Sequence, residues 1–205
     1  MCNIIIWVAD VGSITKNRFG WCRKEVEGDA VTVGQDIKCF TEGIAEDMSL
    51  GRRVALGFEC PLFVPVTDEP QGLTKARHGE GNRPWSAGAG AGALAVGLSE
   101  SVWVLTRINM LSLIPVQVTL NWDDFYRGDK NLFIWEAFVS RNEKGVSDCD
   151  DALIAANSFS RYFPKIQCAS CVEAENPFSL IGAAIVRSGL AKDTTLLSQP
   201  VVVIK

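Results

Sequence analysis

Three apolar segments of the sequence each carry one acidic residue at or near the place where the apolar run stops. Asp10 and Glu59 directly follow such runs, and Glu136 lies within the run of residues 132–139. A buried carboxylate without a partner is costly, so each of these acids needs a cation, a hydrogen-bond network or a metal ion. One such acid would mean little, but three in equivalent places indicate a site.

A second source of acids is the segment SDCDDAL, residues 147–153. Asp148 and Asp151 are three residues apart, which places them on one face in the first turn of a helix that this segment is expected to begin. Acids there are also ordinary capping and dipole partners. For Asp148 this structural role fits as well as a functional one, whereas the position of Asp151, deeper in the helix, favours function.

The residue types favour a hard divalent cation over zinc. Carboxylate oxygens are preferred by Mg²⁺ and Mn²⁺, whereas zinc sites in proteins are usually rich in Cys and His. The chain has a single histidine, His78, and its lone CxxC pair, Cys168 and Cys171, has no second pair at matching spacing. We therefore expect Mg²⁺ or Mn²⁺ at the acids, and buried thiols at the two cysteines.

The elements that must position these acids follow from hydrophobic periodicity. Continuous apolar runs predict buried strands, a spacing of three and four residues predicts amphipathic helices, and their order predicts an α/β domain around a mixed sheet with flanking helices. Acids at the carboxyl ends of neighbouring parallel strands would meet at one rim of that sheet. The predicted strands are residues 4–9, 19–22, 31–33, 54–58, 132–139 and 201–204, and the predicted helices are residues 36–50, 147–163 and 178–189.

A glycine-rich run, AGAGAGALAVGL at residues 87–98, resembles a phosphate-binding loop at first sight. A dinucleotide fingerprint needs a strand directly before it, but residues 75–84 are polar, and no Gly-Lys-Ser/Thr ending is present. We interpret the run as the closely packed start of a helix, with an apolar stripe formed by Leu94, Leu98, Val102 and Leu105. This helix would belong to an insertion at about residues 62–128, after the fourth strand.

Cations gather in the loop before the glycine run, in a chain that is otherwise acidic. Arg77, His78 and Arg83 lie downstream of Glu59, and Trp85 follows them. One hypothesis is that they bind substrate phosphates, with Trp85 stacking on a base. A solvated loop without such a role fits equally well.

Composition sets the outer bounds. With 205 residues, 47% of them apolar, the chain is expected to form a single domain. A net charge of −4 disfavours a tight duplex binder, and seven irregularly spaced cysteines disfavour a disulfide scaffold. No signal peptide is evident, and the apolar region at 87–116 is interrupted by charged residues, so we expect a soluble, cytoplasmic protein without membrane association. The sequence leaves a homodimer open.

Several short motifs together resemble the ribonuclease-H-like superfamily, and within it a domain-of-unknown-function group of predicted nucleases. The likeness spans most of the chain in order. The motifs are the strand ending in Asp10 with Gly12 after it, Phe19-Gly20-Trp21, Phe58-Glu59-Cys60-Pro61, Trp135-Glu136, Asp148-x-x-Asp151-Ala-Leu, Phe178-Ser-Leu-Ile-Gly and Pro200-Val-Val-Val.

The resemblance implies a fold, an activity and a ligand set. The fold would be a ribonuclease-H-like mixed sheet, and the activity would be metal-dependent hydrolysis of phosphodiester bonds in nucleic acid. Asp10, Glu59 and Asp151 would bind the metal ion, which activates the attacking water. Asp148 and Glu136 would be further catalytic candidates.

Two other interpretations remain open. The segment DVGSITK, ending at Lys16, resembles the first phosphate loop of actin-like and sugar-kinase ATPases, although those enzymes clamp nucleotide between two such domains. Asp10 would then hold magnesium, and Gly12, Ser13 and Thr15 would face the phosphates. Lys16 would be a further substrate-binding candidate. Alternatively, the domain keeps the fold and binds a partner without catalysis, and its acids are paired by arginines rather than by metal ions.

Overall fold

The computed structural model describes residues 3–81, 84–139 and 144–205. In these residues the main sheet has seven strands, in the order β3-β2-β1-β4-β7-β6, with β9 beside the other half of β7. β1, β4, β7, β6 and β9 run parallel to one another, whereas β2 is antiparallel to both β1 and β3. The strands are β1 (Ile4–Asp10), β2 (Gly20–Glu25), β3 (Val31–Gly34), β4 (Arg53–Phe58), β6 (Val118–Thr119), β7 (Leu132–Ala137) and β9 (Val203–Ile204).

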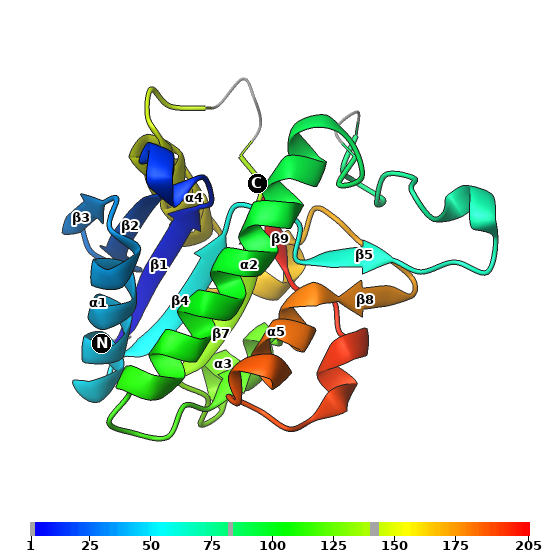
Figure 1. The fold of residues 1–205 in the computed structure, drawn as a ribbon. Coiled ribbons are helices and arrows are strands. Elements are labelled where there is room, and N and C mark those ends of the chain that lie inside the picture. Colours follow the sequence, from blue (N-terminus) through cyan, green and yellow to red (C-terminus); the bar gives the residue numbers. More distant parts are fainter. Residues whose placement is uncertain (1–2, 82–83, 140–143) are drawn as a thin grey trace.

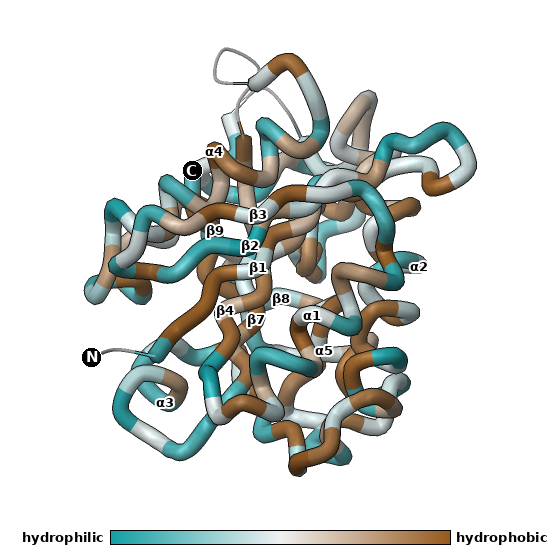
Figure 2. Tube along the Cα trace, turned by 90° about the vertical axis from the view of Figure 1, so that its left-hand side faces the viewer, coloured by the Kyte–Doolittle hydropathy of each residue, from teal (hydrophilic) through white to brown (hydrophobic). Residues whose placement is uncertain are grey.

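Helices cover both faces of this sheet, as expected for strands that are apolar along their whole length (Figures 1 and 2). β1 illustrates the alternation: Ile5 and Trp7 pack into the core under α1, α2 and α5, whereas Ile4 and Ile6 pack into the core under α3 and α4. The helices are α1 (Ile37–Ser49), α2 (Gly88–Leu111), α3 (Trp122–Arg127), α4 (Asp148–Tyr162) and α5 (Leu180–Ser188). The predicted α/β class with a mixed sheet and flanking helices is therefore confirmed.

The segment between β4 and β7 is more ordered than the sequence suggests. It contains β5 (Phe63–Pro65), which pairs with β8 (Pro177–Ser179) in a separate two-stranded sheet. Short 3₁₀ turns complete the chain at η1 (Ile14–Lys16), η2 (Pro70–Gly72), η3 (Ile166–Ala169) and η4 (Thr194–Ser198). The sequence does not predict β5, because three residues carry too little periodicity to indicate a strand.

α2 begins in the glycine run, as predicted, but its buried face differs from the predicted stripe. Leu105 is buried, whereas Leu98 is exposed and the helix instead buries Gly97, Ser101 and Val104. The small side chains at these positions allow close packing against α1, α5 and the end of β4. In length and composition α2 could also cross a membrane, the only helix in the described part of the chain to do so, but one such helix is weak evidence.

Candidate metal centre

The carboxyl ends of three adjacent parallel strands bring the predicted acids to one rim of the sheet. Ala9 of β1 is opposite Phe58 of β4, and Phe58 is opposite Glu136 of β7. The ladder continues one step further, because the Glu59 amide donates a hydrogen bond to the Ala9 carbonyl at 2.8 Å. Asp10 and Glu59 therefore lie side by side where their strands end.

The start of α4 brings the third acid to this rim. Gly20 of β2 is paired with Asp10, and a Cβ at Gly20 would collide with the backbone of Asp148, so only glycine lets α4 approach this closely. Ser147 caps the helix in a capping box with Asp150, as expected for its position. Asp151 does not take part in this cap. It accepts hydrogen bonds from the Gly145 amide and from Lys144, and it lies beside the strand ends that carry Asp10 and Glu59.

Asp10, Glu59 and Asp151 form a compact carboxylate triad. Each contributes an oxygen atom, and these oxygens all lie within 4.8 Å of one another. Asp10 and Asp151 are 8% and 5% exposed, and the Glu59 side chain is 11% exposed. This is the convergence that the sequence predicted for these three residues.

Burial and the neighbouring acids raise the proton affinities of Asp10 and Glu59. Burial, together with the charge of Glu59, raises the pKa of Asp10 to about 8. Burial also raises the pKa of Glu59 to about 7, with Lys144 opposing the rise and Asp151 adding to it. The Asp10 and Glu59 carboxyls share a hydrogen bond. Full ionisation of the three acids is therefore costly without a further positive charge, and a bound cation would relieve that cost.

Lys144 partly neutralises the triad, and sequence reasoning missed it. Its ammonium Nζ lies 2.9 Å from Asp151 Oδ2 and 3.3 Å from Glu59 Oε1. Although partial burial alone would lower the pKa of Lys144, the hydrogen bond to Asp151 and the charge of Glu59 raise it above its usual range. Only its place seven residues before Asp151 in the chain could have pointed to it, and that is no specific signal.

The triad fits a divalent metal ion in its chemistry. All three donors are carboxylate oxygens, the ligand type that hard cations prefer, and Glu59 Oε2 is buried without a hydrogen-bond partner. One lysine leaves two of the three possible carboxylate charges uncompensated. These residues could therefore hold a metal ion, although the geometry does not select one metal.

Glu136 has a different environment, although it lies on the same rim. Arg77 forms two short hydrogen bonds with it, at 2.6 and 2.8 Å, and the Leu62 amide donates a third at 2.9 Å. Arg77 also pairs with Glu80 at 3.0 Å, and the side chains of all three are almost completely buried. Burial raises the pKa of Glu136, and Arg77 acts against that rise.

This network corrects the expectation for Arg77. Its guanidinium has no exposed surface, because Glu136, Glu80 and the Phe63 carbonyl enclose it. It anchors the loop after β4 to β7 and cannot meet a substrate phosphate from this position. Sequence position alone suggested a cation in a polar loop, because its partner Glu136 is 59 residues away.

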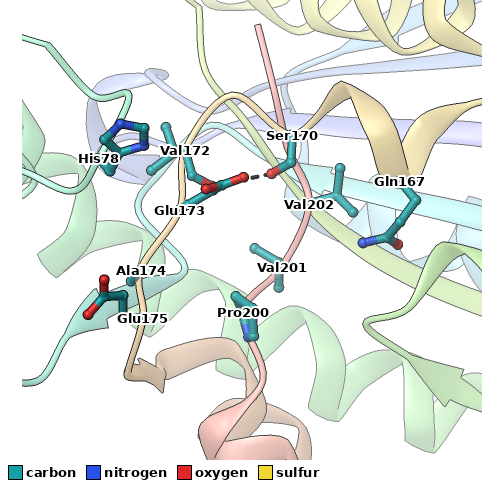
Figure 3. A pocket seen from close by; sticks show the side chains of 10 residues that line it. All are labelled: His78, Gln167, Ser170, Val172, Glu173, Ala174, Glu175, Pro200, Val201 and Val202. Atoms are coloured by element: carbon teal, nitrogen blue, oxygen red, sulfur yellow. Dashed lines mark hydrogen bonds between the residues drawn. The ribbon is translucent and has the colours of Figure 1, made fainter.

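The other predicted binding residues are dispersed. His78 lines a second cavity, of about 650 Å³, with Glu173 and Gln167 (Figure 3). Trp85 is half-buried and donates its indole N–H to the Lys75 carbonyl at 3.0 Å. Lys16 is exposed at the end of η1. Arg83 lies outside the described residues.

Asp148 and the two cysteines of the CxxC pair lie outside the triad. Asp148 lies 4.0 Å from Arg18 and is not one of the three clustered ligands. Cys168 is exposed and Cys171 is half-buried, so the expectation of two buried thiols is wrong for Cys168. Cys168 lies in the short turn η3, where the sequence shows no apolar periodicity.

Two members of the triad border a cavity of about 660 Å³. Asp10, Glu59 and Lys144 line one side, and the first turns of α2 line another. The glycine run is therefore part of the wall of the acidic site. Comparisons with protein-family models, curated proteins and solved structures found no match for this chain.

Proposed function

We propose that this protein hydrolyses phosphodiester bonds in nucleic acid, with Mg²⁺ or Mn²⁺ held by Asp10, Glu59 and Asp151. The observation that carries the proposal is the convergence of these three carboxylates within 4.8 Å, beside a cavity that Asp10 and Glu59 line. The sheet order and the helix that delivers Asp151 are compatible with a ribonuclease-H-like fold. The resemblance of the motifs supports the same assignment.

The chemistry follows from the charges. A divalent cation supplies Lewis acidity, which polarises a phosphoryl oxygen and lowers the pKa of a water molecule. The three carboxylates hold and orient the ion, and its charge in turn favours their ionised forms against the burial that raises the pKa of Asp10 and Glu59. Lys144, at the rim, offers a point charge for a phosphate oxygen once its carboxylate partners bind the ion.

The test is cleavage of single-stranded and duplex DNA and RNA in the presence of Mn²⁺. We expect metal-dependent cleavage by the wild type, and a loss of at least about 100-fold in Asp10→Asn and Asp151→Asn, because each removes a charged ligand. Asp129→Asn is a matched control, since this exposed acid pairs only with Lys130, at 3.9 Å. Equal activity in the wild type and both triad variants would overturn the assignment.

A further inference from the structure

The N-terminal part of α2 forms a smooth, side-chain-poor wall of the cavity that contains the triad. Its contributions include Gly88, Ala89, Gly92, Ala93 and Val96, none with a polar side chain. Asp10 and Glu59 of the triad, together with Lys144, line the same cavity. The cavity is therefore lined by charged side chains and by the apolar first turns of α2.

Internal packing does not explain every glycine in this wall. A Cβ at Gly97 would collide with Cys60, and one at Gly90 would come within 2.5 Å of the Pro84 carbonyl oxygen, so these two glycines serve close packing. A Cβ at Gly92 would meet no atom within 4 Å. Glycine within a helix is less stable than alanine or leucine, so the chain keeps a destabilising residue where no protein atom requires it.

The carboxylates of Asp10 and Glu59 are a second, separate indication that the cavity binds a ligand. Asp10 is more than nine-tenths buried yet lines the cavity, and none of the described Lys or Arg residues forms an ion pair with it. Glu59 beside it has a buried oxygen without a hydrogen-bond partner. Apart from the hydrogen bond that they share and the contact of Glu59 with Lys144, the described residues give these two carboxylates no cationic partner, and both line the cavity to which Gly92 contributes.

The charges around the cavity and its volume restrict the class of that ligand. Among its described lining residues, Lys144 is the only cation, beside the acids Asp10, Glu59, Glu80 and Glu136. Proteins that bind duplexes neutralise several phosphates with Lys and Arg, and the described part of this lining provides one such residue. A volume of about 660 Å³ is in the range of pockets for small organic ligands.

We propose that the cavity takes a single unpaired nucleotide, with its base or sugar against the Gly-Ala wall of α2 and its phosphate over the triad. This inference rests on the proposed function and specifies its substrate class. A flat aromatic base gains contact area on a flat wall and needs no particular hydrogen-bond pattern there. Gly92 is kept free of a side chain because the nucleotide occupies that space.

The experiment compares Gly92→Leu with Ala95→Leu, a matched control on an exposed position of α2 that does not line the cavity. Binding of a short fluorescein-labelled single-stranded oligonucleotide, and of the same sequence as a duplex, is followed by anisotropy with Ca²⁺ in place of Mn²⁺. Mn²⁺ affinity is measured by calorimetry, and the thermal midpoint by circular dichroism.

We expect the wild type to prefer the single strand, and Gly92→Leu to weaken that binding at least about tenfold while Ala95→Leu changes it less than about twofold. Mn²⁺ affinity should be unchanged, and the midpoint of Gly92→Leu should not fall, because leucine is the better helix former. Normal single-strand binding by Gly92→Leu, or a duplex preference in the wild type, would overturn the inference alone. Absence of nucleic-acid binding by the metal-loaded wild type would overturn the proposed function as well.

Discussion

Two groups of acids lie on the same rim of the sheet and differ in what balances their charge. Glu136 is held by two short hydrogen bonds from Arg77 and one from the Leu62 amide. Among the described residues, the only cation paired with the triad of Asp10, Glu59 and Asp151 is Lys144, which contacts Asp151 and Glu59. Arg77 therefore balances the charge of Glu136, whereas the described residues do not balance all three charges of the triad.

This difference separates structural acids from candidate ligands. A buried carboxylate with a guanidinium partner fixes a loop and has no capacity left for a ligand, whereas a carboxylate cluster with surplus charge gains from a cation. One alternative supposed that arginines pair the acids of a non-catalytic domain. That description fits Glu136 but not the triad, where no described arginine is bonded to Asp10, Glu59 or Asp151.

The largest expected effect is on stability, at the paired acid. Arg77→Ala should lower the free energy of unfolding by about 3–5 kcal/mol, because it leaves Glu136 and Glu80 buried without their cation. Arg127→Ala is the control, since its exposed pair with Asp123 at 3.7 Å should contribute no more than about 1 kcal/mol. Urea unfolding measures both; similar values for the two variants would contradict the contrast.

At the triad, removing a carboxylate charge should raise the free energy of unfolding rather than lower it. Asp10→Asn should stabilise the metal-free protein by roughly 2 kcal/mol at pH 8, because it removes a buried acid that repels Glu59. Asp129→Asn should change the unfolding free energy by less than about 0.5 kcal/mol. A destabilised Asp10→Asn would mean that the triad is already balanced without a metal ion.

The same contrast predicts a pH dependence. The folded-state pKa of Asp10 is about 8 and that of Glu59 about 7, both above their ordinary values near 4, so the folded protein retains protons that the unfolded chain releases. Stability of the metal-free wild type should therefore fall as pH rises from about 4 to 8. The fall should be smaller in Asp10→Asn; parallel curves for the two proteins would contradict the assigned cause.

Lys144 gives the smallest expected effect. Its side chain is 43% exposed, so solvent weakens its interactions, and Lys144→Met should destabilise the metal-free protein by no more than about 1 kcal/mol. Mn²⁺ should bind a few-fold more tightly, because it no longer displaces an ammonium from Asp151 and Glu59. Weaker Mn²⁺ binding by Lys144→Met, measured by calorimetry, would show that the lysine supports the ion instead.

The resemblance to the ribonuclease-H-like superfamily named the triad, and local signals in the sequence point to the same residues. Asp10 and Glu59 end continuous apolar runs, and Ser147 marks the start of the helix that carries Asp151. Arg77 was wrongly assigned to substrate binding because its partner Glu136 is 59 residues away in the chain. Lys144 was missed because it lies in an irregular segment without a specific sequence signal. Leu98 was placed on the wrong face of α2, since a helix that is apolar nearly all round gives no clear stripe.

Direct titration of the metal-free protein with Mn²⁺ tests the central claim, that the unpaired triad and not the paired Glu136 binds the ion. Calorimetry should show binding by the wild type and by Glu136→Gln, provided circular dichroism confirms that this variant is folded. Binding should be at least about tenfold weaker in Asp10→Asn and Asp151→Asn. No binding by the wild type, or equal binding by the triad variants, would contradict the account.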